Sequence, residues 1–304
     1  ISSSNDAMVF GAITLGNNVT LDTNASNTTG DLTIGVVTGG SNTLTLSTGD
    51  NVNNSDITAS GNISGVTTLT LADVGGTATL SGDVDVTTLG VNNTVANLVF
   101  SGNGSSVANA VEFINDGTLT LGTSGGTQTF GGGLTTTSVG STVTLNGTIN
   151  ASDDTITLGA VTLGSNTTVD TNATTTNAAG LTIGAVTGGS NTLTLSTENN
   201  IANADITASG AISGVTTLTI SNAGGTSTLS GDVDVTTLTV GNTVANLAFT
   251  GNGSTVTNAI AFANDGTLTL GQSGGTQTYN AGLDTSSVGS TVTLNGTIAT
   301  SNDA

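Results

Sequence analysis

The stretch Leu69-Thr-Leu-Ala-Asp-Val-Gly-Gly-Thr-Ala-Thr-Leu80 decides the fold. Aliphatic and polar residues alternate on both sides of a glycine pair, which is the period of a strand with one buried and one solvated face. Glycine adopts the backbone conformations that sharp turns need. The stretch therefore predicts a strand, a glycine corner and a second strand. The pattern returns in Leu119-Thr-Leu-Gly-Thr-Ser-Gly-Gly-Thr-Gln-Thr-Phe130 and, more loosely, in Leu32-Thr-Ile-Gly-Val-Val-Thr-Gly-Gly-Ser-Asn-Thr-Leu44.

The same alternation extends along the whole chain, for example in Thr43-Leu-Thr-Leu-Ser47 and Thr142-Val-Thr-Leu145. Short alternating runs are separated by clusters of glycine and asparagine, which favour turns, and no window has the period of an amphipathic helix. The sequence therefore predicts an all-β protein.

A long internal repeat organises the chain. The segment 32–149 returns 149 residues later as 181–298, with about three-quarters of its positions identical. The segments predicted from this repeat are the end of a preceding repeat at 1–3, repeat unit 1 at 4–151, repeat unit 2 at 152–300 and the start of a further repeat at 301–304.

The predicted architecture is a right-handed parallel β-solenoid of tandem repeats of about 149 residues, and the alternative is a string of tandem β-sandwich modules. Aromatic residues make up only 2% of the chain, which favours a narrow solenoid core filled by Leu, Val, Ile and Ala. Phe100, Phe113 and Phe130 are expected to lie in that core. Rungs of about 20 residues would place about seven in each unit, spaced by about 4.8 Å.

The composition excludes several classes of function. The chain has no Lys, Arg, His, Cys, Pro or Trp, and its 20 acidic residues give a formal net charge of -20. It therefore lacks the usual general bases, Schiff-base amines and phosphate-binding side chains. Nucleic acids and anionic lipids are bound mainly through Lys and Arg, so neither is expected as a partner. No apolar run is long enough for a membrane helix, so no membrane insertion is expected in this segment.

Two acidic pairs recur at equivalent positions. Asp83 and Asp85 return as Asp232 and Asp234. Residues i and i+2 of a strand point to one side, so each pair is expected to place two carboxylates about 7 Å apart. With no cation in the chain, these four aspartates are candidate Ca²⁺ ligands. The alternative is that they are solvated charges, and the glycine-rich nonapeptide that binds calcium is absent.

Threonine pairs and glycosylation-like triplets are also abundant. Thr-x-Thr pairs resemble the surface of threonine-rich ice-binding solenoids, but their irregular spacing favours ordinary outward-facing strand residues. Asn-x-Ser/Thr triplets fit N-glycosylation, although most are expected by chance in so polar a sequence. The triplets begin at Asn18, Asn62, Asn103 and Asn146, among others.

Two further features carry no expected chemistry. Glu112 and Glu198 align with Ala261 and Gly49 in the other unit, which argues against a glycosidase pair. Asn115-Asp-Gly117 is expected to form a turn between strands.

Motifs such as Asn115-Asp-Gly-Thr-Leu-Thr-Leu121 and Val143-Thr-Leu-Asn-Gly-Thr-Ile149, in long near-identical units, resemble the repeat regions of large bacterial surface proteins. The resemblance is to autotransporter passenger domains, including rickettsial outer-membrane surface antigens, and to haemagglutinin-like adhesins. It implies export to the cell surface and a β-helical adhesin or fibre.

Repeat and composition together predict a structural, non-catalytic, extracellular fibre or adhesin stalk. Its expected partners are other copies of itself, cell-surface molecules or glycans. The alternative is a module that binds glycan or Ca²⁺, with equivalent sites in both units. An enzyme such as a pectate-lyase-like β-helix is disfavoured, because such enzymes commonly use Arg or Lys as the base.

Overall fold

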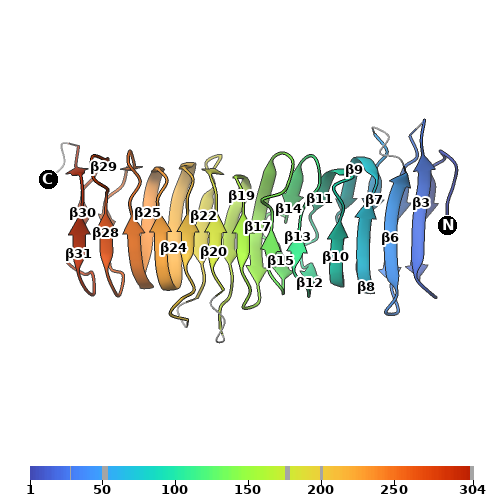
Figure 1. Ribbon diagram of the computed structural model, residues 1–304, viewed down its shortest axis with the longest axis horizontal. Coiled ribbons are helices and arrows are strands. Elements are labelled where there is room, and N and C mark those ends of the chain that lie inside the picture. The colour runs from blue at the N-terminus through green and yellow to red at the C-terminus, as the bar shows by residue number, and fades with distance from the viewer. Residues whose placement is uncertain (28, 50–53, 175–178, 199–200, 302–304) are drawn as a thin grey trace. The chain divides into compact units, whose positions relative to one another are not determined.

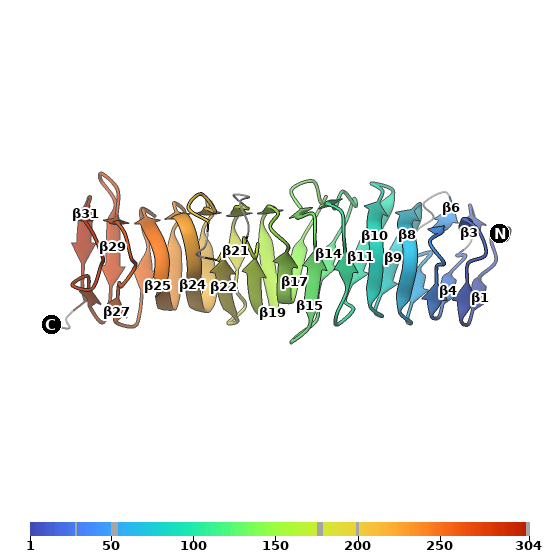
Figure 2. The ribbon, with the colours of Figure 1, turned by 90° about the horizontal axis from the view of Figure 1, so that it is seen from below.

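The computed structural model describes residues 1–27, 29–49, 54–174, 179–198 and 201–301. It divides into two compact units, Ile1–Ile149 and Asn150–Ala304. Every element in the described ranges is a strand, and no helix long and apolar enough to cross a membrane occurs in them. In each unit, strands of successive turns lie side by side (Figures 1 and 2). The predicted parallel β-solenoid is confirmed, and the β-sandwich alternative is wrong because sandwich sheets are antiparallel.

Unit 1 contains the strands β1 (Met8–Phe10), β2 (Ile13–Thr14), β3 (Val19–Ala25), β4 (Leu32–Ile34), β5 (Val37–Thr38), β6 (Thr43–Gly49), β7 (Ile57–Ala59), β8 (Ile63–Ala72), β9 (Val74–Leu80), β10 (Val84–Val91), β11 (Val95–Phe100), β12 (Ser106–Val107), β13 (Val111–Glu112), β14 (Leu119–Leu121), β15 (Thr127–Phe130) and β16 (Leu134–Thr135). The chain passes from unit 1 to unit 2 along β17 (Val143–Ala151).

Unit 2 contains the strands β18 (Ile156–Leu158), β19 (Val161–Asp170), β20 (Leu181–Ile183), β21 (Val186–Thr187), β22 (Thr192–Ser196), β23 (Ile206–Ala208), β24 (Ile212–Leu229), β25 (Val233–Phe249), β26 (Thr255–Val256), β27 (Ile260–Ala261), β28 (Leu268–Leu270), β29 (Thr276–Tyr279), β30 (Leu283–Asp284), β31 (Val292–Leu294) and β32 (Thr297–Ala299).

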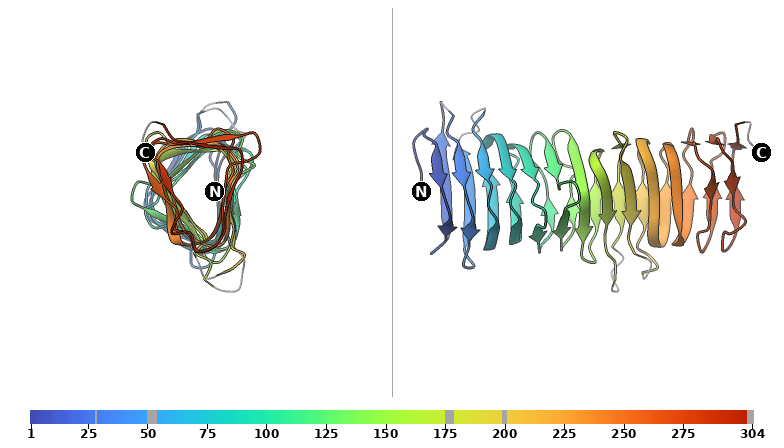
Figure 3. Two further views of the ribbon diagram at one scale, coloured as in Figure 1. Left: turned by 90° about the vertical axis from the view of Figure 1, so that its left-hand side faces the viewer. Right: turned by 180° about the vertical axis from the view of Figure 1, so that it is seen from behind.

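The turns of each unit have three sides (Figure 3). In unit 1, the first side stacks β1, β4, β7, β9, β11 and β14 in parallel. The second stacks β2, β5, β8, β10, β12 and β15, and the third begins with β3, β6 and the later part of β8. A long strand such as β8 therefore continues round a corner and serves two sides.

Paired residues of neighbouring turns lie 20 to 26 positions apart in the sequence, from Thr217 with Thr237 to Thr167 with Leu193. The backbone N–H of Asp56 bonds to a side chain 25 residues earlier, and that of Asp83 to one 21 residues earlier. Turns are thus slightly longer than the 20 residues expected, because corner segments such as the one containing Gly39 and Gly40 add to the strands.

The core of each unit is a column of inward-facing aliphatic side chains. Leu44 and Leu69 are neighbours in register and fully buried, as the strand period predicts. Phe100, Phe113 and Phe130 are buried, as predicted. Their rings form a cluster in which Phe130 lies 6.1 Å from Phe100 and 5.9 Å from Phe113 between ring centroids. Such contacts stabilise the core beyond the area that they bury.

The predicted glycine corners are partly correct. In the stretch 119–130, Gly122 and Gly125 adopt φ values of 79° and 75° between β14 and β15, as expected. In the stretch 69–80, the break between β8 and β9 is instead at Asp73, whose φ is 53°. Aspartate is one of the few side chains that tolerate this left-handed conformation, so the chain needs no glycine there.

Asparagine and aspartate hold the corners together. The side-chain oxygen of Asp56 accepts a hydrogen bond from Thr77 N at 2.7 Å, and that of Asn97 accepts one from Thr118 N at 3.0 Å, each from the next turn. At another corner, Asn18 accepts one from Thr43 N at 3.0 Å. A corner exposes backbone N–H groups that the strand ladder leaves unpaired, and these side chains satisfy them.

Candidate functional site: paired surface grooves

Asp83 and Asp232 lie at corners and bond to the next turn. Asp83 precedes β10, and its Oδ1 accepts a hydrogen bond from Gly104 N at 2.7 Å. The Oδ1 of Asp232 accepts the equivalent bond from Gly253 N, also at 2.7 Å. Both carboxylates thus stabilise the stacking of neighbouring turns.

Asp85 and Asp234 have a different environment. They are exposed residues of β10 and β25, and no described side chain or backbone group hydrogen-bonds to their carboxylates. Three or more acidic residues do not come together as a possible metal site anywhere in the described ranges. Ca²⁺ binding by Asp83, Asp85, Asp232 and Asp234 stays a prediction. The two members of each pair have different surroundings, since one bonds to the next turn and the other is exposed.

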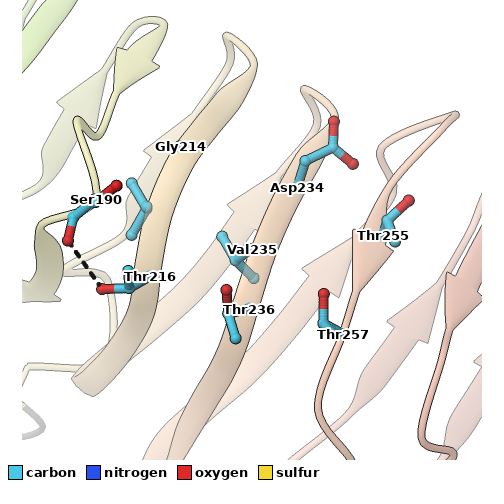
Figure 4. Close-up of a pocket in the computed structure, with 9 residues that line it drawn as sticks. Ser190, Gly214, Thr216, Asp234, Val235, Thr236, Thr255 and Thr257 are labelled. Atoms are coloured by element: carbon cyan, nitrogen blue, oxygen red, sulfur yellow. Dashed lines mark hydrogen bonds between the residues drawn. The ribbon is translucent and has the colours of Figure 1, made fainter.

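Asp234 lines an open groove of about 280 Å³ on the surface of unit 2. Figure 4 shows its carboxylate, the hydroxyls of Thr216 and Thr236 on neighbouring strands, and Thr255 on the strand beyond. The Thr216 hydroxyl donates to the backbone oxygens of Asn191 at 3.1 Å and, more weakly, of Ser190 at 3.4 Å. The complete lining is Ser190, Gly214, Val215, Thr216, Asp234, Val235, Thr236, Thr255 and Thr257.

Unit 1 has the same groove, with a volume of about 300 Å³. Its lining is Ser41, Gly65, Val66, Thr67, Asp85, Val86, Thr87 and Ser106. Each of these residues is the repeat equivalent of a residue in the unit 2 groove. The two grooves are therefore equivalent features of the two repeats.

The hollow exists because of a glycine bulge. The register between β8 and β10 shifts so that Asp85 pairs with Ser64 and Val86 with Val66, and no residue of β10 is in register with Gly65. Gly65 has a φ of 67°, and a Cβ placed there would meet no atom closer than 3.6 Å. A bulge bends the strand locally, and the missing side chain leaves open space at the bend.

The threonine pairs lie on strands, and on one side of each unit they stack in register although their spacing in the sequence is irregular. The variable length of the turns converts uneven spacing in sequence into regular stacking in space. In unit 2 two columns of threonines run across β22, β24 and β25, and these are Thr192, Thr217 and Thr237, and Thr194, Thr219 and Thr239. In unit 1 the equivalent columns are Thr43, Thr68 and Thr88, and Thr45, Thr70 and Gly90.

The two glutamates lie in unlike places. Glu112 Oε1 accepts a hydrogen bond from the Ser138 hydroxyl at 3.2 Å on an exposed part of unit 1. Partial burial raises the pKa of Glu198 above its usual range, and the neighbouring Asp170 carboxylate adds to this effect by repulsion and by a hydrogen bond. Glu198 also has a φ of 59°, where unit 1 carries Gly49.

The asparagines of the glycosylation-like triplets differ in exposure and in bonding. The side-chain oxygens of Asn18 and Asn62 accept hydrogen bonds from backbone N–H groups of the next turn. Asn103 is exposed, but the hydroxyl of Ser105 in the same triplet is buried and accepts a hydrogen bond from Val84 N at 3.1 Å. Glycosylation stays a prediction.

The Asn-Asp-Gly segments lie between strands, as predicted, but their asparagines are buried. Asn115 Nδ2 donates to Thr118 O, and Asn264 Nδ2 donates to Thr267 O, each at 2.9 Å. These amides brace their own turns. Their burial was missed because the pattern predicts a solvated turn.

Comparison of the chain with protein-family models, with curated proteins and with solved structures finds no match.

Proposed function

We propose that the chain is a structural, non-catalytic part of an extracellular fibre or adhesin stalk. The observation that carries the proposal is how the polar side chains are used. At the corners of both units, Asn and Asp bond to the backbone of the next turn, as Asp56 does to Thr77 N in unit 1 and Asp205 to Thr226 N in unit 2. Side chains used in this way stiffen the stack of turns.

The composition supports the same role. The charge of -20, with no cationic side chain, opposes sideways stacking of the β-sheets and keeps the surface hydrated. Lys and Arg are the cleavage sites of trypsin-like proteases, so their absence suits exposure outside the cell. The near-identity of the two repeats suits a protein whose selected property is length.

Electron microscopy of the purified chain tests the structural part of the proposal. The expected particles are thin rods whose diffraction shows a spacing of about 4.8 Å along the long axis. Compact globules would refute the stalk.

The location is tested separately with an antibody against the chain, which is expected to label intact producing cells. Labelling that requires lysis of the cells would refute an extracellular location.

A further inference from the structure

We propose that each unit binds a neutral sugar residue in its groove, with Asp85 in unit 1 and Asp234 in unit 2 as the principal hydrogen-bond acceptors. The proposal goes beyond the structural role and does not depend on it, because the strand ladders are the same whether or not the grooves are filled.

The charge of the groove restricts the ligand. Its polar side chains are one carboxylate and several hydroxyls, as in the Asp234, Thr236 and Thr255 set of unit 2. A carboxylate only accepts hydrogen bonds, and a hydroxyl both donates and accepts. The ligand must therefore donate to the carboxylate and exchange hydrogen bonds with the hydroxyls. Phosphate, sulfate and acidic sugars are excluded because the chain has no cationic side chain to pair with them.

The size of the groove favours a sugar ring over a metal ion. A volume of 280 to 300 Å³ lies near the lower end for small-molecule sites. A Ca²⁺ ion gathers six to eight oxygens at about 2.3–2.6 Å and would leave most of this space empty. Each groove contributes one carboxylate, and its hydroxyls are spread over neighbouring turns, which suits the separate hydroxyls of a pyranose.

A protonated amine fits less well than a neutral polyol. No aromatic side chain lines either groove, so the cation–π contacts that hold quaternary ammonium ligands are missing. A primary ammonium would pair with the carboxylate and leave the hydroxyls on the neighbouring turns unused. The valines at the floor, such as Val86 and Val235, are almost fully buried, which leaves little apolar surface for an aliphatic ligand. Hydroxyls around a single acceptor match a neutral sugar best.

Comparison of the units supports a retained site. Asp85 and Asp234 keep a carboxylate that makes no hydrogen bond within the described chain, although about a quarter of the aligned positions differ. Ser106 is replaced by Thr255, which keeps the hydroxyl. Thr257 stands where unit 1 has alanine and adds a hydroxyl to the unit 2 groove. We therefore expect unit 2 to bind more tightly.

The test is a titration of the full ¹⁵N-labelled chain, followed by NMR, with the methyl glycosides of glucose, galactose and mannose. Glucosamine and calcium chloride are titrated in parallel. Saturable shifts are expected for the amides of Gly65 and Asp85 in unit 1 and of Gly214 and Asp234 in unit 2 with at least one neutral glycoside. A shallow polar groove predicts a Kd of about 1 mM.

Isosteric variants identify the acceptor. Asp85→Asn is expected to raise the Kd of the unit 1 groove about tenfold and to leave the Kd of the unit 2 groove unchanged, because a hydrogen bond to a charged group is lost. Asp234→Asn is expected to raise the Kd of the unit 2 groove by the same factor and to leave that of the unit 1 groove unchanged. Asp116→Asn is the matched control, since it removes an exposed carboxylate outside the groove and should change neither Kd.

Three results would overturn the proposal. These are the absence of saturable shifts with every neutral glycoside, shifts with glucosamine or calcium alone, and glycoside binding that Asp85→Asn and Asp234→Asn leave intact. None of them bears on the stalk, which the electron microscopy tests.

Discussion

Two equivalent glutamines differ in the partner of one buried oxygen. Gln128 and Gln277 are both buried, and the Nε2 of each donates to backbone, Gln128 to Gly102 O at 2.7 Å. In unit 2 the Tyr279 hydroxyl donates to Gln277 Oε1 at 3.1 Å. In unit 1 the equivalent residue is Phe130, and Gln128 Oε1 has no hydrogen-bond partner in the described part of the chain. One hydroxyl therefore decides whether a buried amide is satisfied.

The two units allow reciprocal substitutions. Tyr279→Phe is expected to destabilise unit 2 by about 1–3 kcal/mol, because it leaves a buried acceptor without a partner. Phe130→Tyr is expected to stabilise unit 1 by about 1 kcal/mol, because it adds the missing hydrogen bond. The added hydroxyl should fit, since the rings have similar packing: Phe130 is 5.9 Å from Phe113, and Tyr279 is 6.3 Å from Phe262, both edge to face.

Amide hydrogen exchange measured by NMR follows the two units separately. Tyr279→Phe should speed exchange in β29 and leave β15 unchanged, and Phe130→Tyr should slow exchange in β15 and leave β29 unchanged. Each variant thus contains its own control in the unmutated unit. If neither substitution changes the exchange free energy of its own unit, the hydroxyl contributes no stability at this position and the prediction is wrong.

Tyr279 also provides a test by pH. Burial raises the pKa of its phenol far above the ordinary value of about 10. A raised pKa contributes stability that is complete below the unfolded pKa and is lost as pH rises, because the unfolded state ionises first. Wild type should therefore lose stability above about pH 10 more steeply than Tyr279→Phe. The chain has one tyrosine, so tyrosinate absorbance in wild type reports this group alone.

Three further substitutions and one control test other features of the packing, each by chemical denaturation followed by circular dichroism. Ser227→Ala should stabilise unit 2 by about 1–2 kcal/mol, because the buried Ser227 hydroxyl has no hydrogen-bond partner in the described structure. Unit 1 has alanine at the equivalent position. Unchanged stability would mean that the hydroxyl is satisfied. Glu198→Gln should become more stable relative to wild type as the pH rises from 4 to 7. Burial and the Asp170 carboxylate raise the pKa of Glu198, so the stability that Glu198 contributes to wild type is lost as the pH rises through its folded pKa. An equal pH dependence in wild type and variant would contradict this. Gly140→Ala should lower the free energy of unfolding by about 1–3 kcal/mol, since the added Cβ would lie 1.9 Å from a backbone oxygen of the preceding turn. The control Gly11→Ala should leave the free energy of unfolding unchanged, because its added Cβ would meet no atom within 4 Å.

Alternation and repetition by themselves determined the fold class, the core and the pairing of equivalent positions in the two units. Inward residues such as Leu44 and Leu69, and the aromatic Phe130, were predictable because side chains alternate strictly across a strand. The exposed position of Asp85 followed from the same alternation.

Contacts between turns were decided only by the tertiary structure. The groove beside Asp85 depends on a bulge at Gly65, and Asp83 bonds to a backbone N–H 21 residues away. The threonine columns and the partner of Gln277 likewise depend on which residues of separate turns face each other. Register is set by the number of residues in each corner, and this number varies from turn to turn. A local pattern shows which side of a strand a residue occupies, but only the folded stack of turns brings its neighbours beside it.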